Sequence, residues 1–310
     1  EEYEDYCARP GRKRNISNVF DSDGMISFTI NKPKWQRFED KVWNMFYHLE
    51  SDILPIGDTV LFYDDSNSRQ IDGVYADEKY LYIVECKYRS KKSGRNQPPG
   101  GILDDVRKWH GQWKRVCRSL SEIPEIGRER TPIFVLATYG VEWTKQLKDE
   151  VGEIGVLIDN SQIDGVIDLK KNIGLSAKAV FLQELFKESK KFSEIEGPKK
   201  VFNCTRTKID GFQIYNFFAN SGDLINLANV PRRMPSGGDL SQAYQRALKP
   251  AKVNQIGTYL SDKGAFFPNS VIIAVEEECE FYCDVEGEVS DIGKVELPNK
   301  YGSLFIIDGQ

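Results

Sequence analysis

Apolar side chains recur at helical spacing in two stretches of the N-terminal half. Over residues 34–50 they follow one another at steps of three and four residues, directly after Pro33, and proline is well tolerated in the first turn of a helix. The same spacing returns over residues 103–120, where Trp109 and Trp113 share a side. We therefore expect an amphipathic helix in each stretch.

Short apolar runs bounded by polar turns predict strands between and after these helices. The expected strands lie at 59–63, 70–75, 80–88, 133–138 and 155–159. Residues 143–151 have a helical pattern, and residues 160–169 read as a hairpin-like stretch. The order of helix, three strands, helix, strand, helix and strand is typical of an α/β layer domain, here a mixed sheet flanked by helices.

A chain of 310 residues suggests two domains, at roughly 150 residues each. We expect an N-terminal extension at 1–32, the α/β domain at 33–169, a helical connector at 170–200 and a second, α+β domain at 201–310. The connector should hold a helix near 176–189. The second domain should hold strands and helices, with strands expected at 209–218, 271–275, 281–285 and 304–307, and helices at 240–248 and after Pro250.

Composition narrows the class of protein. Apolar residues make up 40% and charged residues 29% of the chain, and no apolar run approaches the ~18 residues that span a bilayer. The six cysteines are scattered and only two histidines are present, so a structural zinc site cannot be assembled. We expect reduced thiols, a cytoplasmic location and no membrane contact.

Three charged side chains can converge on one hairpin. If Tyr75 pairs with Tyr80, Asp72 lies opposite Ile83, and Asp72 then shares a face with Glu85 and Lys87, because side chains alternate along a strand. A slip of one residue would turn that face over. Glu-x-Lys alone is a weak signal, and an ordinary ion pair on a surface strand is the competing interpretation.

Two carboxylates beside an ammonium suit phosphodiester cleavage. Mg²⁺ prefers oxygen ligands and binds through one or two carboxylates plus waters and phosphate oxygens, and Mn²⁺ is expected to substitute for it. Asp72 and Glu85 are the expected metal ligands. Lys87 would orient or deprotonate the attacking water, or offset the developing negative charge.

Residues 33–169 resemble the PD-(D/E)xK restriction-endonuclease superfamily. The resemblance rests on Asp72, Glu85 and Lys87, which follow an expected helix. The resemblance implies a metal-dependent deoxyribonuclease that acts on double-stranded DNA. It also implies that Glu39, on the first helix, joins the catalytic set, although a solvated helix charge is an equal alternative. The proline of the family name is absent, since Ile71 precedes Asp72.

The net charge of −5 does not indicate a nucleic-acid binder, but net charge conceals local patches. A basic run without acidic residues directly follows the expected catalytic strand and includes Lys91, Lys92 and Arg95. We expect these three side chains to contact DNA. A solvated surface is the alternative.

Residues 205–310 resemble the DGQHR-domain proteins, which include the DndB regulators of DNA phosphorothioation, and more distantly the ParB/sulfiredoxin-like fold. The matching segments are Tyr244-Gln-Arg246, residues 267–275 and the terminal turn of Asp308, Gly309 and Gln310. Arg232, Arg233 and Arg246 are the candidate nucleic-acid contacts of this half. We expect the polypeptide to continue past Gln310 with a basic residue, although an Asp-Gly β-turn is the simpler interpretation.

Together these features predict a Mg²⁺-dependent DNA endonuclease whose second domain recognises DNA and directs cleavage. The family context implies a bacterial defence system related to DNA modification or directed against phage, with possible partner proteins. Two cuts in a duplex favour a homodimer or larger homo-oligomer. The alternatives are a non-catalytic DNA-binding regulator and a nucleotide-binding switch.

Overall fold

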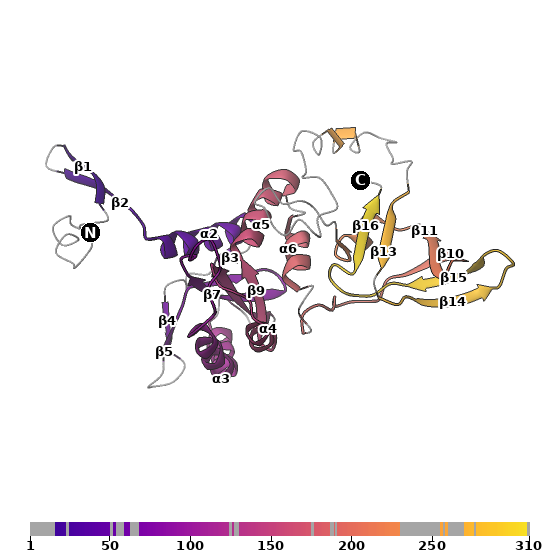
Figure 1. Ribbon diagram of the computed structural model, residues 1–310, viewed down its shortest axis with the longest axis horizontal. Helices are drawn as coiled ribbons and strands as arrows, with labels where there is room; N and C mark the ends of the chain where they lie inside the picture. The colour runs from indigo at the N-terminus through magenta and orange to yellow at the C-terminus, as the bar shows by residue number, and fades with distance from the viewer. Residues whose placement is uncertain are drawn as a thin grey trace.

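The chain is a mixed α/β protein with helices flanking its largest sheet (Figure 1). The computed structural model describes residues 16–22, 25–49, 52–53, 59–62, 68–123, 126, 130–174, 177–186, 189, 191–229, 255–256, 258–259, 270–275 and 277–308. Near the N-terminus, β1 (Ile16–Ser22) and β2 (Met25–Ile30) form an antiparallel hairpin. In the described residues, no helix is both long and apolar enough to cross a membrane.

The largest sheet has five strands in the order β3-β6-β7-β8-β9. These are β3 (Asp52–Ile53), β6 (Gly73–Ala76), β7 (Tyr80–Tyr88), β8 (Thr131–Tyr139) and β9 (Gly155–Asp159). The β6–β7 pair is antiparallel, whereas β7, β8 and β9 run parallel. The sheet is therefore mixed, and β7 and β8 are its buried centre.

Two layers of helices cover the sheet. On one face lie α2 (Lys34–His48), α5 (Asn160–Ile173) and α6 (Ala177–Phe186), and on the other α3 (Ile102–Ser121) and α4 (Lys145–Gly152). Side chains of β7 alternate between the two cores: Tyr82 and Val84 pack toward α2, whereas Leu81 and Ile83 pack toward α3. The predicted α/β layers and the predicted helices α2 and α3 are confirmed.

The hairpin expected at 160–169 is wrong, because this stretch is the first part of α5. Asp159 and Gln162 form a capping box that satisfies backbone groups at the start of the helix. Ile163, Val166 and Leu169 then recur every three residues and are buried against the sheet. Helical periodicity and the cap together outweigh the turn propensity of this segment.

The continuous strand expected at 70–75 is also wrong. The chain bends at Asp72, which separates β5 (Ser68–Ile71) from β6. β5 pairs with β4 (Thr59–Phe62) in a separate two-stranded ribbon. Asp72 therefore lies at the branch between the ribbon and the main sheet.

The expected pairing of Tyr75 with Tyr80, and of Asp72 with Ile83, is corrected by two residues. Tyr75 pairs with Tyr82 instead. The reason is a tight turn in which the Asp77 carboxylate accepts the backbone N–H groups of Lys79 and Tyr80, at 2.8 and 2.7 Å. An even shift preserves the predicted face, because side chains alternate with a period of two.

The helix expected at 176–189 is present as α6, and it packs into the main core. The ring of Phe181 lies 5.8 Å from that of Phe46 on α2 and 6.2 Å from that of Tyr82 on β7. The segment predicted to be a connector therefore contributes a core helix, and α5 continues past residue 169, where the first domain was expected to end.

The second half contains two further sheets (Figure 1). One has the order β11-β10-β15-β14, and the other has the order β12-β16-β13. Their strands are β10 (Val201–Ile209), β11 (Phe212–Phe217), β12 (Ala228–Asn229), β13 (Ile272–Val275), β14 (Glu280–Val285), β15 (Asp291–Glu296) and β16 (Leu304–Asp308). The short helix α7 (Ser221–Leu224) follows β11.

The strand expected at 209–218 is present over Phe212–Phe217 as β11, whereas Ile209 ends β10, and the two strands form a hairpin. Asp210 and Gly211 both have positive φ, at 50° and 85°, as a two-residue hairpin turn requires. Strand β15 was not predicted at all. The expected helix at 240–248, together with Arg232, Arg233, Arg246, Gly309 and Gln310, lies outside the described residues.

Contacts join the second half to the main core. The ring of Tyr301 lies 5.3 Å from that of Phe186 on α6, and Lys79 in the β6–β7 turn pairs with Glu196 at 3.3 Å. The β6–β7 turn is thus the end of the hairpin that meets the C-terminal half. The opposite end of the hairpin carries Asp72.

We predict that Asp77→Asn destabilises the protein at neutral pH by about 1–3 kcal/mol, because the buried carboxylate also accepts from Tyr82 Oη at 2.9 Å and pairs with Lys178 at 3.2 Å. Burial alone would raise the pKa of Asp77, but hydrogen bonds from Tyr80 and Lys79 and the charge of Lys178 hold the pKa below its ordinary value.

A group with a depressed pKa stabilises the fold fully above its unfolded pKa and loses that contribution as pH falls through the folded pKa. The difference between wild type and Asp77→Asn in urea unfolding should therefore shrink from neutral pH to about pH 3. Glu78→Gln, an exposed neighbour in the same turn, is the matched control and should change little. A pH-independent difference would contradict this role for the Asp77 charge.

Candidate active site

Asp72, Glu85 and Lys87 meet at the end of the β6–β7 hairpin. The register Gly73–Val84, continued by one residue, places Asp72 opposite Glu85. The backbone N–H of Cys86 donates to Asp72 Oδ2 at 2.7 Å, which ties the branch-point carboxylate to β7. Alternation along β7 places Glu85 and Lys87 on the face covered by α3, and the hydrogen bond from Cys86 places Asp72 at the same end of β7.

Lys87 bridges two carboxylates. Its Nζ lies 2.8 Å from Glu85 Oε1 and 3.2 Å from Asp105 Oδ2 on α3. Burial opposes the charge of Lys87 and would lower its pKa, but the charge and hydrogen bond of Glu85, followed by those of Asp105, raise the pKa above its ordinary value. A raised pKa favours the protonated form of Lys87, and an ammonium can orient a water but cannot deprotonate it.

Glu85 holds an unsatisfied carboxylate oxygen. Its side chain is buried, and Oε2 has no hydrogen-bond partner among the described residues, whereas Oε1 is paired with Lys87. A buried charged oxygen without a partner is costly and calls for a ligand such as an ion or an ordered water. Glu85 lies opposite Asp72 when the β6–β7 register is continued by one residue, which makes Asp72 the candidate partner for a shared ligand.

Glu39 on α2 approaches from the other side of the sheet. The thiol of Cys86, which points toward that layer, has a pKa raised first by burial and then by the charges of Asp72, Glu39 and Glu85. The carboxylates of Asp72, Glu39 and Glu85 therefore all lie near the Cys86 thiol, at the end of β7. Glu39 does not share the face of Glu85, however, because α2 packs on the opposite layer.

The carboxylates of Asp72 and Glu85 could hold a metal ion whose remaining ligands are waters and phosphate oxygens of a substrate. Within the described part of the chain, no group of three or more His, Cys, Asp or Glu side chains is arranged to hold a metal on its own. Mg²⁺ commonly keeps several waters and binds through one or two carboxylates together with substrate phosphates. Asp72 and Glu85 suit that mode and do not suit a dedicated protein cage.

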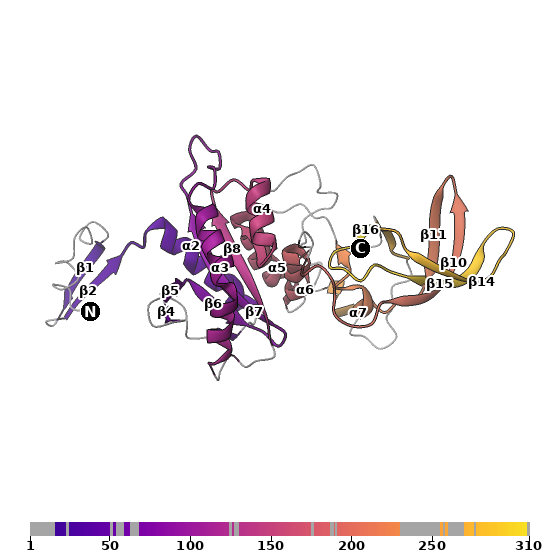
Figure 2. The same cartoon turned by 90° about the horizontal axis from the view of Figure 1, so that it is seen from below.

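A basic loop leaves β7 next to this site and projects beyond the end of the sheet (Figure 2). Lys92 and Arg95 are joined by two backbone hydrogen bonds across Ser93 and Gly94, whose φ values are 49° and 76°. This is the geometry of a tight two-residue hairpin turn. Lys91, Lys92 and Arg95 are all exposed on it, as a DNA contact requires.

The base of the loop is held against β8. The backbone N–H of Arg89 donates to Tyr139 O at 2.8 Å, and that of Gln97 donates to Gly140 O at 2.8 Å. Gly140 has a φ of 68°, and a Cβ there would lie 2.1 Å from the Arg89 carbonyl oxygen, so only glycine fits this close approach. The basic residues are thus carried on an anchored turn.

Asp105 was missed by the sequence analysis. Its position follows from α3 packing Ile102, Val106 and Trp109 on the face of β7 that carries Glu85 and Lys87. The available signal was the pair Asp104-Asp105 in the first turn of the helix that follows the strand of Glu85 and Lys87. Such acids ordinarily indicate only a favourable interaction with the helix dipole.

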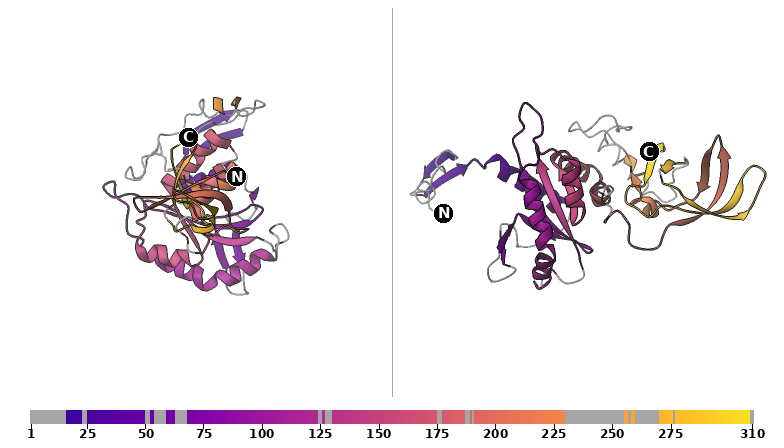
Figure 3. Two further views of the ribbon diagram at one scale, coloured as in Figure 1. Left: turned by 90° about the vertical axis from the view of Figure 1, so that its right-hand side faces the viewer. Right: turned by 60° about the horizontal axis from the view of Figure 1, so that its bottom comes forward.

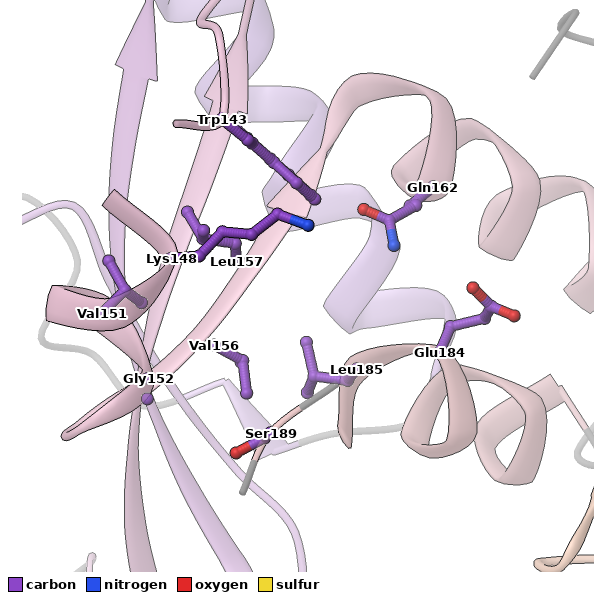
Figure 4. A pocket seen from close by; sticks show the side chains of 11 residues that line it. Trp143, Lys148, Val151, Gly152, Val156, Leu157, Gln162, Glu184, Leu185 and Ser189 are labelled. Atoms are coloured by element: carbon purple, nitrogen blue, oxygen red, sulfur yellow. The ribbon is translucent and has the colours of Figure 1, made fainter. Parts of the chain in front are cut away.

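A cavity of about 90 Å³ lies elsewhere, between β9 and helices α4, α5 and α6 (Figure 4). Lys148, Gln162 and Glu184 are among its polar lining residues. Ligand pockets are typically ~300–1,000 Å³, so this cavity is too small for a nucleotide. Because its lining includes none of the three hairpin residues, it is not part of the candidate active site.

We predict that Lys87→Met lowers the free energy of unfolding in EDTA by about 1–3 kcal/mol, because Glu85 and Asp105 lose their shared cation. Breaking a fully buried ion pair costs ~3–5 kcal/mol, and breaking a partly exposed one costs less. Mg²⁺ should restore part of that loss by supplying positive charge to the carboxylates. Lys108→Met is the matched control, because the exposed Lys108 also pairs with Asp105, at 3.9 Å. Urea unfolding with EDTA and with Mg²⁺ measures both effects, and equal stability of Lys87→Met in the two buffers would contradict the prediction.

Comparison with protein-family models, curated proteins and solved structures finds no match to this chain, so the geometry of the hairpin is what supports its function.

Proposed function

We propose that the chain is a Mg²⁺-dependent DNA endonuclease with a PD-(D/E)xK-type site built on Asp72, Glu85 and Lys87. The observation that carries the proposal is the buried Glu85 Oε2, which has no hydrogen-bond partner in the described residues and lies opposite a second carboxylate. Protein interiors rarely leave a charged oxygen unsatisfied without a functional reason. A divalent cation satisfies both carboxylates at once.

Each side chain then has a role that its surroundings support. Asp72 and Glu85 would hold the ion, and the Cys86 N–H fixes the orientation of Asp72. When bound, the ion supplies Lewis-acid stabilisation of the phosphate and a more acidic water. Lys87, protonated by its surroundings, would orient that water and offset negative charge on the phosphate. Glu39 remains a candidate for the same set, from the α2 side.

The loop beside the site suits DNA as the substrate. Lys91, Lys92 and Arg95 present three cations on one anchored turn next to the carboxylates. A polyanion can lie along these cations while one phosphate reaches the metal ligands. Double-stranded DNA, with Mn²⁺ able to replace Mg²⁺, is the substrate that we propose.

The second half is proposed to recognise DNA and direct cleavage, in the manner of a DGQHR or ParB-like domain. This part of the proposal rests on the sequence resemblance, because Arg232, Arg233 and Arg246 lie outside the described residues. A role in bacterial defence, with partner proteins, rests on the same resemblance. The alternatives remain a non-catalytic regulator of the DndB type and a nucleotide-binding switch.

We predict that Asp72→Asn, Glu85→Gln and Lys87→Ala each lower Mg²⁺-dependent cleavage of plasmid DNA by about 10²-fold or more, because each removes a charge that acts on the reacting phosphate. Lys108→Ala, on the exposed side of α3, should cleave like wild type. Nicking and linearisation are followed on gels with Mg²⁺, Mn²⁺ and EDTA, and urea unfolding verifies each fold.

The result also separates the alternatives. Mg²⁺-independent DNA binding without cleavage of modified or unmodified DNA would support the regulator. Saturable binding of a nucleoside triphosphate without DNA would support the switch. A Lys87→Ala protein that cleaves at the wild-type rate would remove Lys87 from the mechanism.

We predict that replacing Lys91, Lys92 and Arg95 together by Ala weakens binding to DNA of any sequence. The slope of log K against log salt should flatten by up to about 2.7, or about 0.9 for each phosphate contact. The matched control removes Lys114, Arg115 and Arg118, exposed cations about 14–20 Å farther along α3 from Asp105. If both triple variants change the slope equally, net charge and not the loop governs binding.

A further inference from the structure

Strand β11 lies at one edge of the four-stranded sheet. Among the residues that the structure describes, β11 pairs with β10 alone. From Phe212 to Asn220 the chain contains no charged residue, no proline and no glycine. Edge strands of monomeric proteins are normally blunted by lysine, proline or a bulge, because their free backbone groups otherwise pair with another strand.

The β10–β11 hairpin also exposes apolar side chains. It extends away from the helices (Figures 2 and 3). Phe212 is 74% exposed, Ile214 43% and Phe218, just past the strand, 101%. Phe212 and Ile214 share the outer face, since Phe202, Cys204 and Phe217 pack on the inner one. The strand neighbours on this face, Thr207, Ile209 and Asn216, carry no charge, and Asp210 in the turn is acidic, so the face does not suit a nucleic acid.

The other edge of the same sheet is different. β14 carries Glu280 and Asp284, and Glu286 and Glu288 follow it. A second copy aligned along β14 would set carboxylates against carboxylates, and like charges directly opposite one another are destabilising. Self-association is therefore disfavoured at β14 and unopposed at β11.

From this contrast we infer that two copies of the chain pair antiparallel along β11, so that their four-stranded sheets join into one eight-stranded sheet. The occupant of the edge is a second copy because the strand has no charge that would repel itself. With the two-fold axis perpendicular to the sheet, the outer face of one copy continues into the outer face of the other. Phe212 and Ile214 of the two copies then come into cross-strand contact across the seam, which adds apolar pairing to the new hydrogen bonds.

The arrangement does not depend on the proposed nuclease activity, although it would give each assembly two candidate sites. Isologous pairing uses the same strand on both copies, so it closes at two subunits and leaves β14 free. It predicts a dimer and not an open-ended polymer. It also predicts that β11 loses its exposed backbone amides on assembly, whereas β14 does not.

The test compares the oligomeric state of the full chain with that of edge variants by sedimentation across micromolar concentrations. Ile214→Lys and Phe212→Lys change exposed side chains, so both should fold, and each should weaken the dimer by about tenfold or more because two lysines meet at the seam. Val285→Lys is the matched control, since Val285 is 57% exposed on the opposite edge strand, and it should leave the dimer unchanged.

Hydrogen exchange supplies the second readout. Alternate amides of β11 should exchange more slowly as the dimer forms, and those of β14 should not change. A wild-type chain that stays monomeric, or one that grows beyond two copies, would overturn the inference. So would a dimer that survives both β11 variants, or one in which the β11 amides stay unprotected, since face-to-face packing would then hold the copies together.

Discussion

The register of the β6–β7 hairpin determines where Asp72 lies relative to Glu85 and Lys87. The Asp77 turn closes the hairpin at one end, and counting back from that turn brings Asp72 opposite Glu85 at the other. A slip of one residue would send Asp72 to the α2 layer and bury it among apolar rings. The turn that contacts the C-terminal half therefore also determines which residues lie opposite one another at the Asp72 end of the hairpin.

The site contains more negative charge than it can satisfy on its own. Lys87 is shared by two acids, Glu85 and Asp105, Asp72 lies at the same strand end, and one buried oxygen of Glu85 has no hydrogen-bond partner within the described residues. Such an arrangement costs stability, whereas an apolar strand end would not. A cost of this kind is expected where a ligand completes the site, which supports the proposed binding of a cation together with a phosphate.

Much of this could be predicted from the sequence, for identifiable reasons. The helices α2 and α3 and the strand β7 have strong periodicity and match their predicted spans closely. The shared face of Glu85 and Lys87 follows from strand alternation alone. Strand alternation does not predict three other features. The bend at Asp72 depends on the separate β4–β5 ribbon, and the two-residue register change depends on the turn held by Asp77. Helix α5 depends on its capping box. Asp105 enters only through helix packing on the sheet, which a local pattern does not contain.

Asp72 and Glu85 are proposed to bind one divalent cation together. Anomalous diffraction from crystals soaked in Mn²⁺ tests this directly, because manganese scatters anomalously and replaces magnesium at oxygen sites. We expect a peak in contact with one oxygen of each carboxylate, at about 2.1 Å, with Glu85 Oε2 as one of the ligands. A peak elsewhere on the chain, or an occupied site that contacts neither carboxylate, would contradict it.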